Sequence, residues 1–505
     1  MELKIVRSLI NELNQKNILY CHWKSNQHIK DVFTGKDDID LLVDRGSIPR
    51  LNIILNDLGF KRFSLPDKRR YIGIEDYLGY DKEQGKLVHL HLHYQLTVGE
   101  KFLKGYHLPF ESFILNRRIY YNKYDVYITS HEDEMWLLLV RLTMKIRYRD
   151  YIKHLLGKYV IDSTTKEEYK WLYERVDKEE YIKVILSLFG KDLAHMYSSQ
   201  YKLNLCFKDI RTIRKITLNI CKPFKIYTRL GATCKKWNRE AFRIYQELNK
   251  YILKRPKLFR RSPIAGGISI SFIGPDGAGK STIINDLKLK LTTQMDTKYI
   301  YLGSGDGKSS LLRKPLSLVY NFFLKKNILD RKSKKVGREG KTYRNNEGEK
   351  AALIRKLGEV PWIWTLAIER KRKIQTLRKF RNKGFVVITD RFPQDQFNNI
   401  CDGPRYYKNP NVNKSLINRM LSKKEQKYFE LAKITPPDLV FILNVSSNTA
   451  ALRKPDEVDI ESHKIMMKSI LELDFTIDTK VIEIDANQSY NKVFLSVMDK
   501  LWREL

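Results

Sequence analysis

The pattern of apolar and polar positions divides the chain into three blocks. Residues 1–125 mix helical and strand spacing, starting with the amphipathic segment MELKIVRSLINELNQKN, whereas residues 126–253 hold long helical runs such as EDEMWLLLVRLTMKIR. From residue 268 onward, short apolar runs such as ISISFI and FVVITD alternate with helical segments. Short apolar runs separated by helices are typical of a parallel sheet. The pattern therefore predicts an α+β domain, a helical region and a C-terminal α/β domain with a doubly wound parallel sheet.

A basic segment rich in Pro and Gly, LKRPKLFRRSPIAGG, separates the second block from the third. This composition is typical of loops and domain boundaries, and we interpret residues 254–267 as a basic linker. A long basic insertion, residues 303–350, interrupts the last block. The chain is thus predicted to consist of 1–125, 126–253, the linker, and 268–505.

Composition favours a folded protein of a reducing compartment. The 505 residues are 42% hydrophobic, which is enough for several cores. Five cysteines occur without a C-x-x-C pair, as expected where no disulfide framework forms. No uncharged apolar stretch reaches the roughly 18 residues of a membrane span, and the N-terminal segment lacks the apolar core of a signal peptide. We expect a cytoplasmic protein that is at most peripheral at a membrane.

The formal net charge of +36 predicts affinity for polyanions. Nucleic acid, an anionic membrane or a polyphosphorylated substrate would satisfy it. The alternative is compositional bias, since the chain is also rich in Ile and Asn. Within the insertion, LLRKPLSLVYNFFLKK is apolar and aromatic with basic ends. This stretch either lies on an anionic surface or packs as a helix into the domain core.

The stretch SFIGPDGAGKST joins an apolar run to a helical pattern and has the spacing G-x-x-x-x-G-K-[ST]. In this spacing, glycines allow a tight turn whose N–H groups point at phosphate, a lysine reaches the β and γ phosphates, and a hydroxyl reaches Mg²⁺. We therefore expect ATP and Mg²⁺ to bind here. The residues of this P-loop are Gly274, Gly277, Gly279, Lys280, Ser281 and Thr282.

A second apolar run, GFVVITDRFPQD, ends at Asp390 and Arg391. Open α/β sheets bind their ligands at the carboxyl ends of the strands. A carboxylate there can hold the water shell of Mg²⁺, and the adjacent arginine can clamp a phosphoryl group.

These motifs, with PPDLVFILNVSSNTAALRK and VIEIDANQSYNKVFLSVMDKL after them, resemble thymidylate kinase and its relatives across residues 268–505. The resemblance implies that Asp276 lies on the acceptor side of the P-loop and that Asp390 lies near the metal. It also implies that Arg391, with Arg370 in LAIERKRK, holds the phosphate of the acceptor.

The same resemblance places the lid over the transferring phosphoryl group at LRKPDEVDIESHK, which offers Arg453, Lys454 and Lys464. Because position 277 is Gly, no basic residue sits inside the loop. We therefore expect the lid to meet the charge of the transition state.

The chain departs from the family after the second run. Phe392 stands where the family has Tyr, and Asp402 with Gly403 stands where it has Gln-Gly. The acceptor is thus left open as a nucleotide, a sugar or a glycolipid.

The N-terminal block has a candidate site of its own in WKSNQHIKDVFTGKDDIDLLVDR. Asp38 and Asp40 alternate in a predicted strand, so both point to one face, where two carboxylates can hold metal ions that align a nucleoside triphosphate. The pattern resembles the nucleotidyltransferase fold, with Ser25 conserved in type and Lys24 in place of its Gly.

A later segment, KLVHLHLHYQL, resembles the strand that carries the third carboxylate of that fold. Here His91 stands in place of the carboxylate, and His89 and His93 share its face. Imidazoles so placed ligate a transition metal or form hydrogen bonds within the strand layer. We expect either a weak, Mn²⁺-preferring nucleotidyltransferase or an inactive remnant.

Two classes of function remain. One is a phosphotransferase of the thymidylate kinase type joined to a nucleotidyltransferase-like domain. The other is an ATP-switched protein that binds nucleic acid or a partner without a small-molecule acceptor. The Asp390–Arg391 pair and the basic lid favour the kinase, because a switch needs no acceptor clamp.

Overall fold

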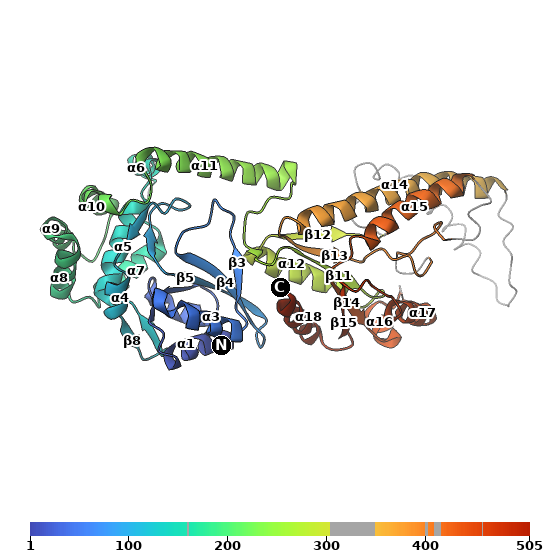
Figure 1. Ribbon diagram of the computed structural model, residues 1–505, viewed down its shortest axis with the longest axis horizontal. Helices are drawn as coiled ribbons and strands as arrows, with labels where there is room; N and C mark the ends of the chain where they lie inside the picture. The colour runs from blue at the N-terminus through green and yellow to red at the C-terminus, as the bar shows by residue number, and fades with distance from the viewer. Residues whose placement is uncertain (159–160, 304–348, 399–401, 409–415, 457) are drawn as a thin grey trace. The chain divides into compact units, whose positions relative to one another are not determined.

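The computed structural model describes residues 1–158, 161–303, 349–398, 402–408, 416–456 and 458–505. The chain forms two compact units, Met1–Ile264 with Trp502–Leu505, and Ala265–Leu501. Figure 1 shows their elements. The central part of the insertion, residues 304–348, lies outside the described residues, and with it the stretch LLRKPLSLVYNFFLKK.

The first unit is built on a mixed sheet of eight strands in the order β10-β3-β4-β5-β2-β1-β9-β8. Two pairings, β2 with β5 and β1 with β9, are parallel, and the other five are antiparallel. The strands are β1 (Tyr20–His22), β2 (Ile39–Val43), β3 (Lys61–Ser64), β4 (Ile74–Asp81), β5 (Lys86–His93), β8 (Ile119–Tyr121), β9 (Val126–Ile128) and β10 (Ser262–Pro263). A small second sheet pairs β6 (Leu96–Val98) with β7 (Tyr106–Leu108).

Strand alternation decides which face of this sheet carries chemistry. Ile39, Leu41 and Val43 of β2 belong to one apolar core, which also holds the buried face of the first helix. The residues between them point to the opposite face, where Leu42 joins a second core with the helical region. Asp40 must therefore face the helical region. The first core is covered by α1 (Lys4–Gln15), α2 (Ile29–Phe33) and α3 (Ile48–Asp57).

Helices make up most of the chain from residue 131 to residue 253. The longest buried stretch is in α5, whose N-terminus is capped by Ser130, which accepts a hydrogen bond from the Asp133 N–H. The helices are α4 (Glu111–Asn116), α5 (His131–Lys145), α6 (Tyr148–Leu155), α7 (Ser163–Tyr173), α8 (Lys178–Phe189), α9 (Lys191–Ser199), α10 (Phe207–Ile220) and α11 (Arg229–Leu248).

Part of the segment predicted as a linker belongs to the first unit. Ser262 and Pro263 form β10, which pairs with β3, and the unit extends to Ile264. Sequence analysis does not detect this strand, because two residues carry no periodicity and the pairing partner lies some 200 residues earlier.

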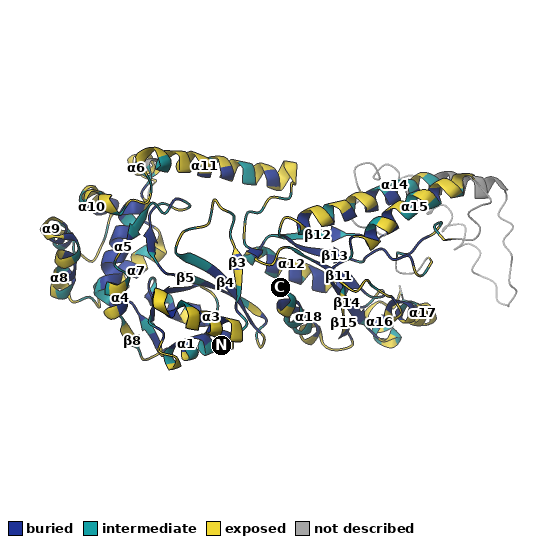
Figure 2. Cartoon of the chain, viewed as in Figure 1, coloured by how far each residue is buried: buried dark blue, intermediate teal, exposed yellow. Residues whose placement is uncertain are grey.

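The second unit has a sheet of five strands in the order β12-β13-β11-β14-β15, and every pairing is parallel. The strands are β11 (Ile268–Ile273), β12 (Thr297–Tyr301), β13 (Val386–Asp390), β14 (Leu439–Asn444) and β15 (Lys480–Asp485). Consecutive residues of β11, β13 and β14 are buried, so both faces of the sheet are covered (Figure 2). This confirms the α/β fold with a parallel sheet.

The helices of this unit connect the strands. They are α12 (Lys280–Gln294), α14 (Glu349–Arg381), α15 (Leu416–Lys433), α16 (Ser447–Arg453), α17 (Ile460–Leu471) and α18 (Tyr490–Glu504). Among the helices of the described residues, none combines the length and the apolar content that a membrane crossing needs.

Candidate active sites

The P-loop connects β11, the central strand of its sheet, to α12. Gly277 and Gly279 have φ angles of +83° and +84°, a backbone that glycine adopts readily. A side chain at 277 would also approach the Ala450 backbone at 3.0 Å. Helix α12 begins at Lys280, so Ser281 and Thr282 lie in its exposed first turn. The loop thus ends at a helix N-terminus, where N–H groups attract phosphate.

Lys280 is folded back over the loop. Its side chain is buried, and its Nζ donates hydrogen bonds to the carbonyl oxygens of Gly274 and Pro275, both at 2.7 Å. The ammonium group therefore lies within the loop that Gly274 opens, as a lysine that contacts phosphate oxygens must.

Asp390 ends β13 and pairs in register with Phe272 of β11, two residues before Gly274. It is buried, and its Oδ1 has no hydrogen-bond partner among the described residues. Burial raises the pKa of Asp390, while the charges of Lys280 and Arg391 oppose the rise. A buried carboxylate oxygen beside the loop fits the water shell of Mg²⁺, which takes oxygen ligands.

Two arginines and one aspartate form an ion-pair bridge beyond the loop. Arg370 of α14 donates from Nη2 to Asp402 Oδ1 at 2.6 Å, and Arg391 donates from Nη1 to Asp402 Oδ2 at 3.2 Å. Arg391 also donates from Nη2 to Asp276 Oδ1 at 3.3 Å. The structure therefore brings the predicted residues Asp276, Arg370 and Arg391 together, and adds Asp402.

Two adjoining cavities connect this bridge to the P-loop. The larger, of about 140 Å³, is lined by Arg370, Arg391, Asp402 and an apolar wall that includes Tyr428 and Met466. The smaller, of about 40 Å³, is lined by Gly274 and Asp276 of the P-loop and shares Arg391, Asp402 and Met466 with the larger. Arg391 thus lines both cavities, whereas Arg370 lines only the larger one.

The predicted lid contributes one side chain to the loop. Arg453, the last residue of α16, donates from Nη1 to the Gly277 carbonyl oxygen at 3.4 Å and from Nη2 to the Ala486 carbonyl oxygen at 2.9 Å. Lys454 follows it directly and is exposed. Lys464 is also exposed and forms an ion pair with Glu461 at 3.2 Å.

His463, between the predicted lid residues, is a candidate that sequence reasoning missed. Its ring is buried, its Nδ1 lies 3.0 Å from Ser447 Oγ, and its Nε2 has no hydrogen-bond partner among the described residues. Burial lowers the pKa of His463, and the charges of Asp276 and Lys280 also act on it. The sequence pointed to its neighbour Lys464 because of its charge. That His463 lies on the inward side of α17 is visible only in the structure.

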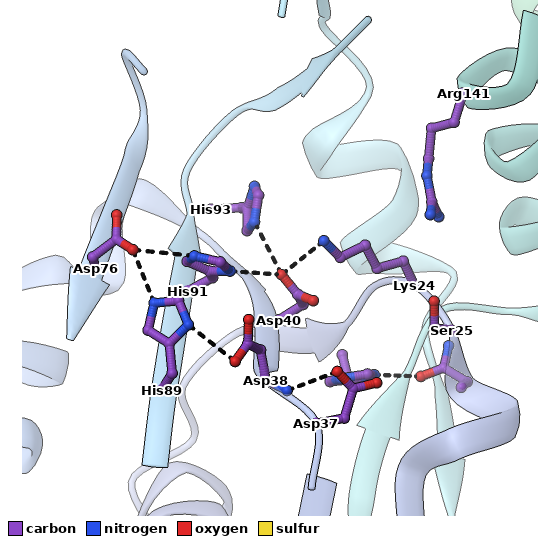
Figure 3. Close-up of polar contacts among 12 residues, drawn as sticks. Lys24, Ser25, Asp37, Asp38, Asp40, Asp76, His89, His91, His93 and Arg141 are labelled. Atoms are coloured by element: carbon purple, nitrogen blue, oxygen red, sulfur yellow. Dashed lines mark hydrogen bonds and ion pairs between the residues drawn. The ribbon is translucent and has the colours of Figure 1, made fainter. Parts of the chain in front are cut away.

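In the first unit, three adjacent strands bring a second set of charged groups into one row. The register pairs Asp40 of β2 with His91 of β5, and His91 with Asp76 of β4. His91 Nδ1 lies 3.3 Å from Asp40 Oδ1, and His91 Nε2 lies 3.1 Å from Asp76 Oδ1 (Figure 3). The imidazole of His91 is therefore held between two carboxylates.

The neighbouring histidines extend the row. His89 lies between Asp76 and Asp38, at 2.8 Å and 3.0 Å, and His93 Nε2 lies 3.4 Å from Asp40 Oδ1. Figure 3 shows the three histidines with these carboxylates. The predicted residues Asp38, Asp40 and His91 are thus brought together.

Sequence reasoning missed Asp76, which supplies a third carboxylate from the strand beyond His91. It also missed Arg261, from the segment predicted as a linker, whose Nε lies 3.2 Å from Asp76 Oδ1 and whose Nη2 lies 2.7 Å from His89 Nε2. The segment IEDYLGYD around Asp76 does not alternate polar and apolar residues, and its register against β5 leaves no signal in the sequence.

Two groups of three residues in this cluster could hold a metal ion. One is Asp38, His89 and His91, and the other is Asp40, His91 and His93; in each group the ligand atoms lie within 4.8 Å of one another. Mixed imidazole and carboxylate ligands suit Mn²⁺ or Zn²⁺ better than Mg²⁺.

The charges of this cluster are set by burial and by the neighbours. Burial raises the pKa of Asp40, but Lys24, whose Nζ lies 2.9 Å away, and then His91 bring it well below the ordinary value. Burial lowers the pKa of His91, yet Asp40 and Asp76 raise it to about 9. Burial lowers the pKa of His93 to about 3. At neutral pH, His91 is therefore charged and His93 is neutral.

Basic side chains accompany the cluster on the helical side. Lys24 and Arg141 lie over the same ring, that of Trp23, at 5.2 Å and 5.6 Å from its centroid. Burial, followed by the charge of Lys24, lowers the pKa of Lys104 to about 7. Burial, followed by the charge of Arg141, lowers the pKa of Lys145 to about 8. An anion would relieve this repulsion between like charges.

The turn that resembles the nucleotidyltransferase motif has an unusual backbone. Ser25 has a φ of +59°, and its N–H donates to Glu168 Oε1 at 3.2 Å. Its hydroxyl therefore sits on a left-handed turn directly before the short 3₁₀ helix Asn26–His28. In this chain the left-handed position is at Ser25, one residue after Lys24, which replaces the family's Gly.

Comparisons with known proteins cover less than half of the chain. No family model matches it. It is similar to the uncharacterized ATP-binding protein YghR of Escherichia coli strain K12, with 27% identity over 231 residues, 44% of this chain and 82% of the relative. It is also similar to the uncharacterized ATP-binding protein YghS of the same strain, with 27% identity over 226 residues, 44% of this chain and 88% of the relative.

Two solved structures of deoxyadenosine kinase from M. mycoides are also similar to the chain. The one with bound dATP has 18% identity and a TM-score of 0.25, and covers 46% of this chain and 99% of that one. The one with products dCMP and dCDP has 17% identity and a TM-score of 0.26, and covers 47% and 100%.

Proposed function

We propose that the unit Ala265–Leu501 is an ATP-dependent phosphotransferase of the thymidylate kinase type. The observation that carries the proposal is the meeting of Lys280, Asp390, Arg391 and Arg453 at one P-loop. A protein that only switches on ATP needs no arginines lining a cavity beyond the loop. The description of YghR and YghS as ATP-binding proteins agrees with this proposal.

Each group has a role on the nucleotide side. Lys280 and the N–H groups that open α12, with Gly274, Gly277, Gly279 and Thr282 shaping the loop, hold the β and γ phosphates of ATP. Ser281 and Asp390 hold Mg²⁺, the latter through water. The ion supplies positive charge to the phosphate oxygens.

Positive charge on the far side of the γ phosphate comes from the lid. Arg453 already touches the loop at Gly277, and Lys454 follows it in the chain. These cations neutralise the charge that develops on the equatorial oxygens of the phosphoryl group during transfer. On the acceptor side, Asp276, Arg370 and Arg391 line the way to the larger cavity, which takes the nucleotide, sugar or glycolipid acceptor.

The test is phosphorus NMR of the full chain with ATP, Mg²⁺ and a panel of nucleosides, nucleoside monophosphates, sugars and lipid-linked glycans. We expect a new phosphoester, and we expect Lys280→Ala to abolish it, since the Lys280 ammonium lies within the loop that would hold the β and γ phosphates. Lys288→Ala, an exposed lysine of the same helix, is the matched control and should keep the parental rate. Parental turnover by Lys280→Ala would refute the site.

A second candidate activity is nucleotidyl transfer in the unit Met1–Ile264. The observation that favours it is the convergence of Asp38, Asp40 and Asp76 around three histidines that could hold a metal ion once His91 gives up its second proton, with Lys24 and Arg141 beside them to meet a triphosphate. The histidines make Mn²⁺ the metal that we propose.

We also propose that the protein acts in the cytoplasm and that its basic surface contacts anionic lipid or nucleic acid. The competing class, an ATP-switched binder, makes a separate prediction. It would bind nucleic acid tightly and in a strongly salt-dependent manner, with slow ATP turnover that no acceptor stimulates. A salt titration of nucleic-acid binding with and without ATP tests that class.

A further inference from the structure

Arg370 and Arg391, which are proposed to line the path of the phosphate acceptor, already form ion pairs with carboxylates of the chain itself. Asp402 gives one carboxylate oxygen to Arg370 and the other to Arg391. The second amino group of Arg391 pairs with Asp276. Two guanidinium charges are therefore matched by two carboxylates.

The Arg370–Asp402 part of this bridge is buried, whereas the side chain of Arg391 is 33% exposed. The side chains of Arg370 and Asp402 are 4% and 1% exposed. Arg370 also donates from Nη1 to Tyr428 Oη at 2.9 Å. Removing the partners of a buried carboxylate is strongly destabilising. A phosphate group on the acceptor would have to replace Asp402 on both arginines and would leave that carboxylate buried without them.

The remaining charges of the larger cavity do not leave an excess of positive charge for a phosphate. Arg405 and Glu425, one of each sign, also line it. Glu425 is held by the backbone N–H groups of residues 405–407. The rest of the wall is mainly apolar, with Ile363, Leu366 and Ala367.

Resting on the proposed phosphotransferase function, we infer that the acceptor is an unphosphorylated alcohol, either a free sugar or a nucleoside, and that Asp402 excludes phosphomonoesters. Asp402 takes the position on the two arginines that the resemblance assigns to the phosphate of the acceptor. The hydroxyl groups of the acceptor bind Arg391, which lines both cavities and whose side chain is 33% exposed. Asp402 and Gly403 stand where the resembled family has Gln-Gly. This difference then explains why the acceptor belongs to another class of substrate.

The transfer itself is balanced without a further reagent. The hydroxyl oxygen of the acceptor bonds to the γ-phosphorus of ATP, and the bond from that phosphorus to the β,γ-bridging oxygen breaks. The products are a phosphate monoester and ADP. The proton of the hydroxyl passes to Asp276, whose carboxylate lines the smaller cavity between the P-loop and Arg391.

The first arm of the test uses the parental full chain with ATP and Mg²⁺. Phosphorus NMR follows paired acceptors, thymidine with thymidine monophosphate and glucose with glucose 6-phosphate. We expect a monoester from the unphosphorylated member of one pair and no new diphosphate signal beyond ADP. Transfer to thymidine monophosphate or to glucose 6-phosphate would overturn the inference. The identity of the product, a sugar phosphate or a nucleoside phosphate, shows which of the two alcohols is the acceptor.

The second arm does not depend on turnover. Calorimetry measures inorganic phosphate binding to the full chain in the parent, in Asp402→Asn and in Asp395→Asn. Asp395 is a matched control, because it is buried in the same unit and pairs with Lys408 and Lys433. We expect Asp402→Asn to bind phosphate at least tenfold more tightly than the parent, and Asp395→Asn to match the parent.

Equal phosphate affinity in the parent and in folded Asp402→Asn would overturn the inference. If Asp402→Asn does not fold, thymidine monophosphate is titrated into the parent, and saturable binding that Arg370→Ala abolishes would overturn it just as directly. Failure of the proposed function is distinct, because it would appear as the absence of a new phosphoester from both members of both acceptor pairs, while the phosphate measurement still stands.

Discussion

The two candidate sites hold their charges in opposite ways. In the N-terminal site, His89 and His91 each lie between two carboxylates that stand on or next to paired strands. In the P-loop site, Arg370 and Arg391 surround one carboxylate, Asp402, and come from a helix and from the end of a strand. The first arrangement offers nitrogen and oxygen ligands to a metal ion, and the second offers donors to oxygen atoms.

The comparison teaches how each kind of site can be recognised. A site on neighbouring strands is set by register, so a single alternation error would move every group to the wrong face. A site at the ends of strands is formed by loops and by the first turns of helices. There the residues of a local sequence motif determine the backbone conformation. We make three predictions that test whether the two sites act independently and differ in their chemistry.

The largest effect is expected from Asp38→Asn combined with Asp40→Asn. This pair removes two carboxylates from the metal groups, so nucleotidyl transfer, measured as pyrophosphate release with Mn²⁺, should be lost altogether. Phosphotransfer at the P-loop should persist at the parental rate, because its residues lie in the other unit.

Asp57→Asn combined with Asp67→Asn makes the same charge change at exposed positions of the same unit and serves as the control. If the Asp38/Asp40 variant binds Mn²⁺ and a triphosphate as well as the parent does, the cluster is a structural remnant, and only the P-loop site remains catalytic.

A smaller effect is expected from Arg453→Ala. Its guanidinium lies on the loop at Gly277, and its interaction should form mainly in the transition state. We expect kcat to fall by about 100- to 1000-fold with little change in the KM for ATP, as steady-state kinetics would show.

Lys464→Ala is the matched control for the lid, since Lys464 is exposed and pairs with Glu461. Exposed ion pairs of this kind contribute about 0 to 1 kcal/mol, so both rate and stability should stay near parental. The reverse result, with kcat lost in Lys464→Ala and kept in Arg453→Ala, would transfer the catalytic charge to α17.

The smallest effect concerns a carboxylate of the first unit that lacks the imidazole partners of Asp40. Glu134 accepts hydrogen bonds from the Asn26 N–H at 2.9 Å and from Asn26 Nδ2 at 2.7 Å. Burial, and then the charge of Glu168, raises the pKa of Glu134 to about 8. A raised carboxyl pKa gives stability that is fully present below the unfolded pKa of about 4.5 and is lost as the pH rises through the folded value.

Glu134→Gln should therefore be more stable than the parent at pH 8, with the gain shrinking toward pH 5. Thermal unfolding followed across this pH range measures it. Glu179→Gln, at an exposed position, should show no such slope, and a parental slope in Glu134→Gln would assign the pH dependence to another group.

The P-loop site is largely predictable from sequence because its geometry is local. The glycines at 277 and 279 adopt the positive φ that the motif requires, and α12 begins at Lys280. Asp390 and Arg391 follow from one apolar run and the rule for strand ends. The bridge to Asp402 could not be predicted, because it depends on a left-handed backbone at that residue, with φ of +62°, and on the path of the chain after β13.

The N-terminal site shows the opposite balance. Alternation alone predicts that Asp38 and Asp40 share one face of their strand and that His89, His91 and His93 share one face of theirs. In the structure β2 begins at Ile39, directly after Asp38, and both sets lie on the same face of the sheet. Asp76 and Arg261 depend on pairings between distant segments, β4 against β5 and β10 against β3. Contacts between distant segments leave no signal in the local sequence pattern. The sequence therefore assigned the position of the third carboxylate to His91 alone.

The place of β11 at the centre of its sheet has a consequence for the synthesis of the chain. Its two neighbours, β13 and β14, begin at residues 386 and 439, more than 100 residues after β11 itself. The ribosome therefore completes nearly all of the first unit, and then most of the second, before the strand that carries the P-loop can pair on both sides. The nucleotide site is therefore completed late in the synthesis and folding of each chain, because it needs contacts of large sequence separation, which form slowly.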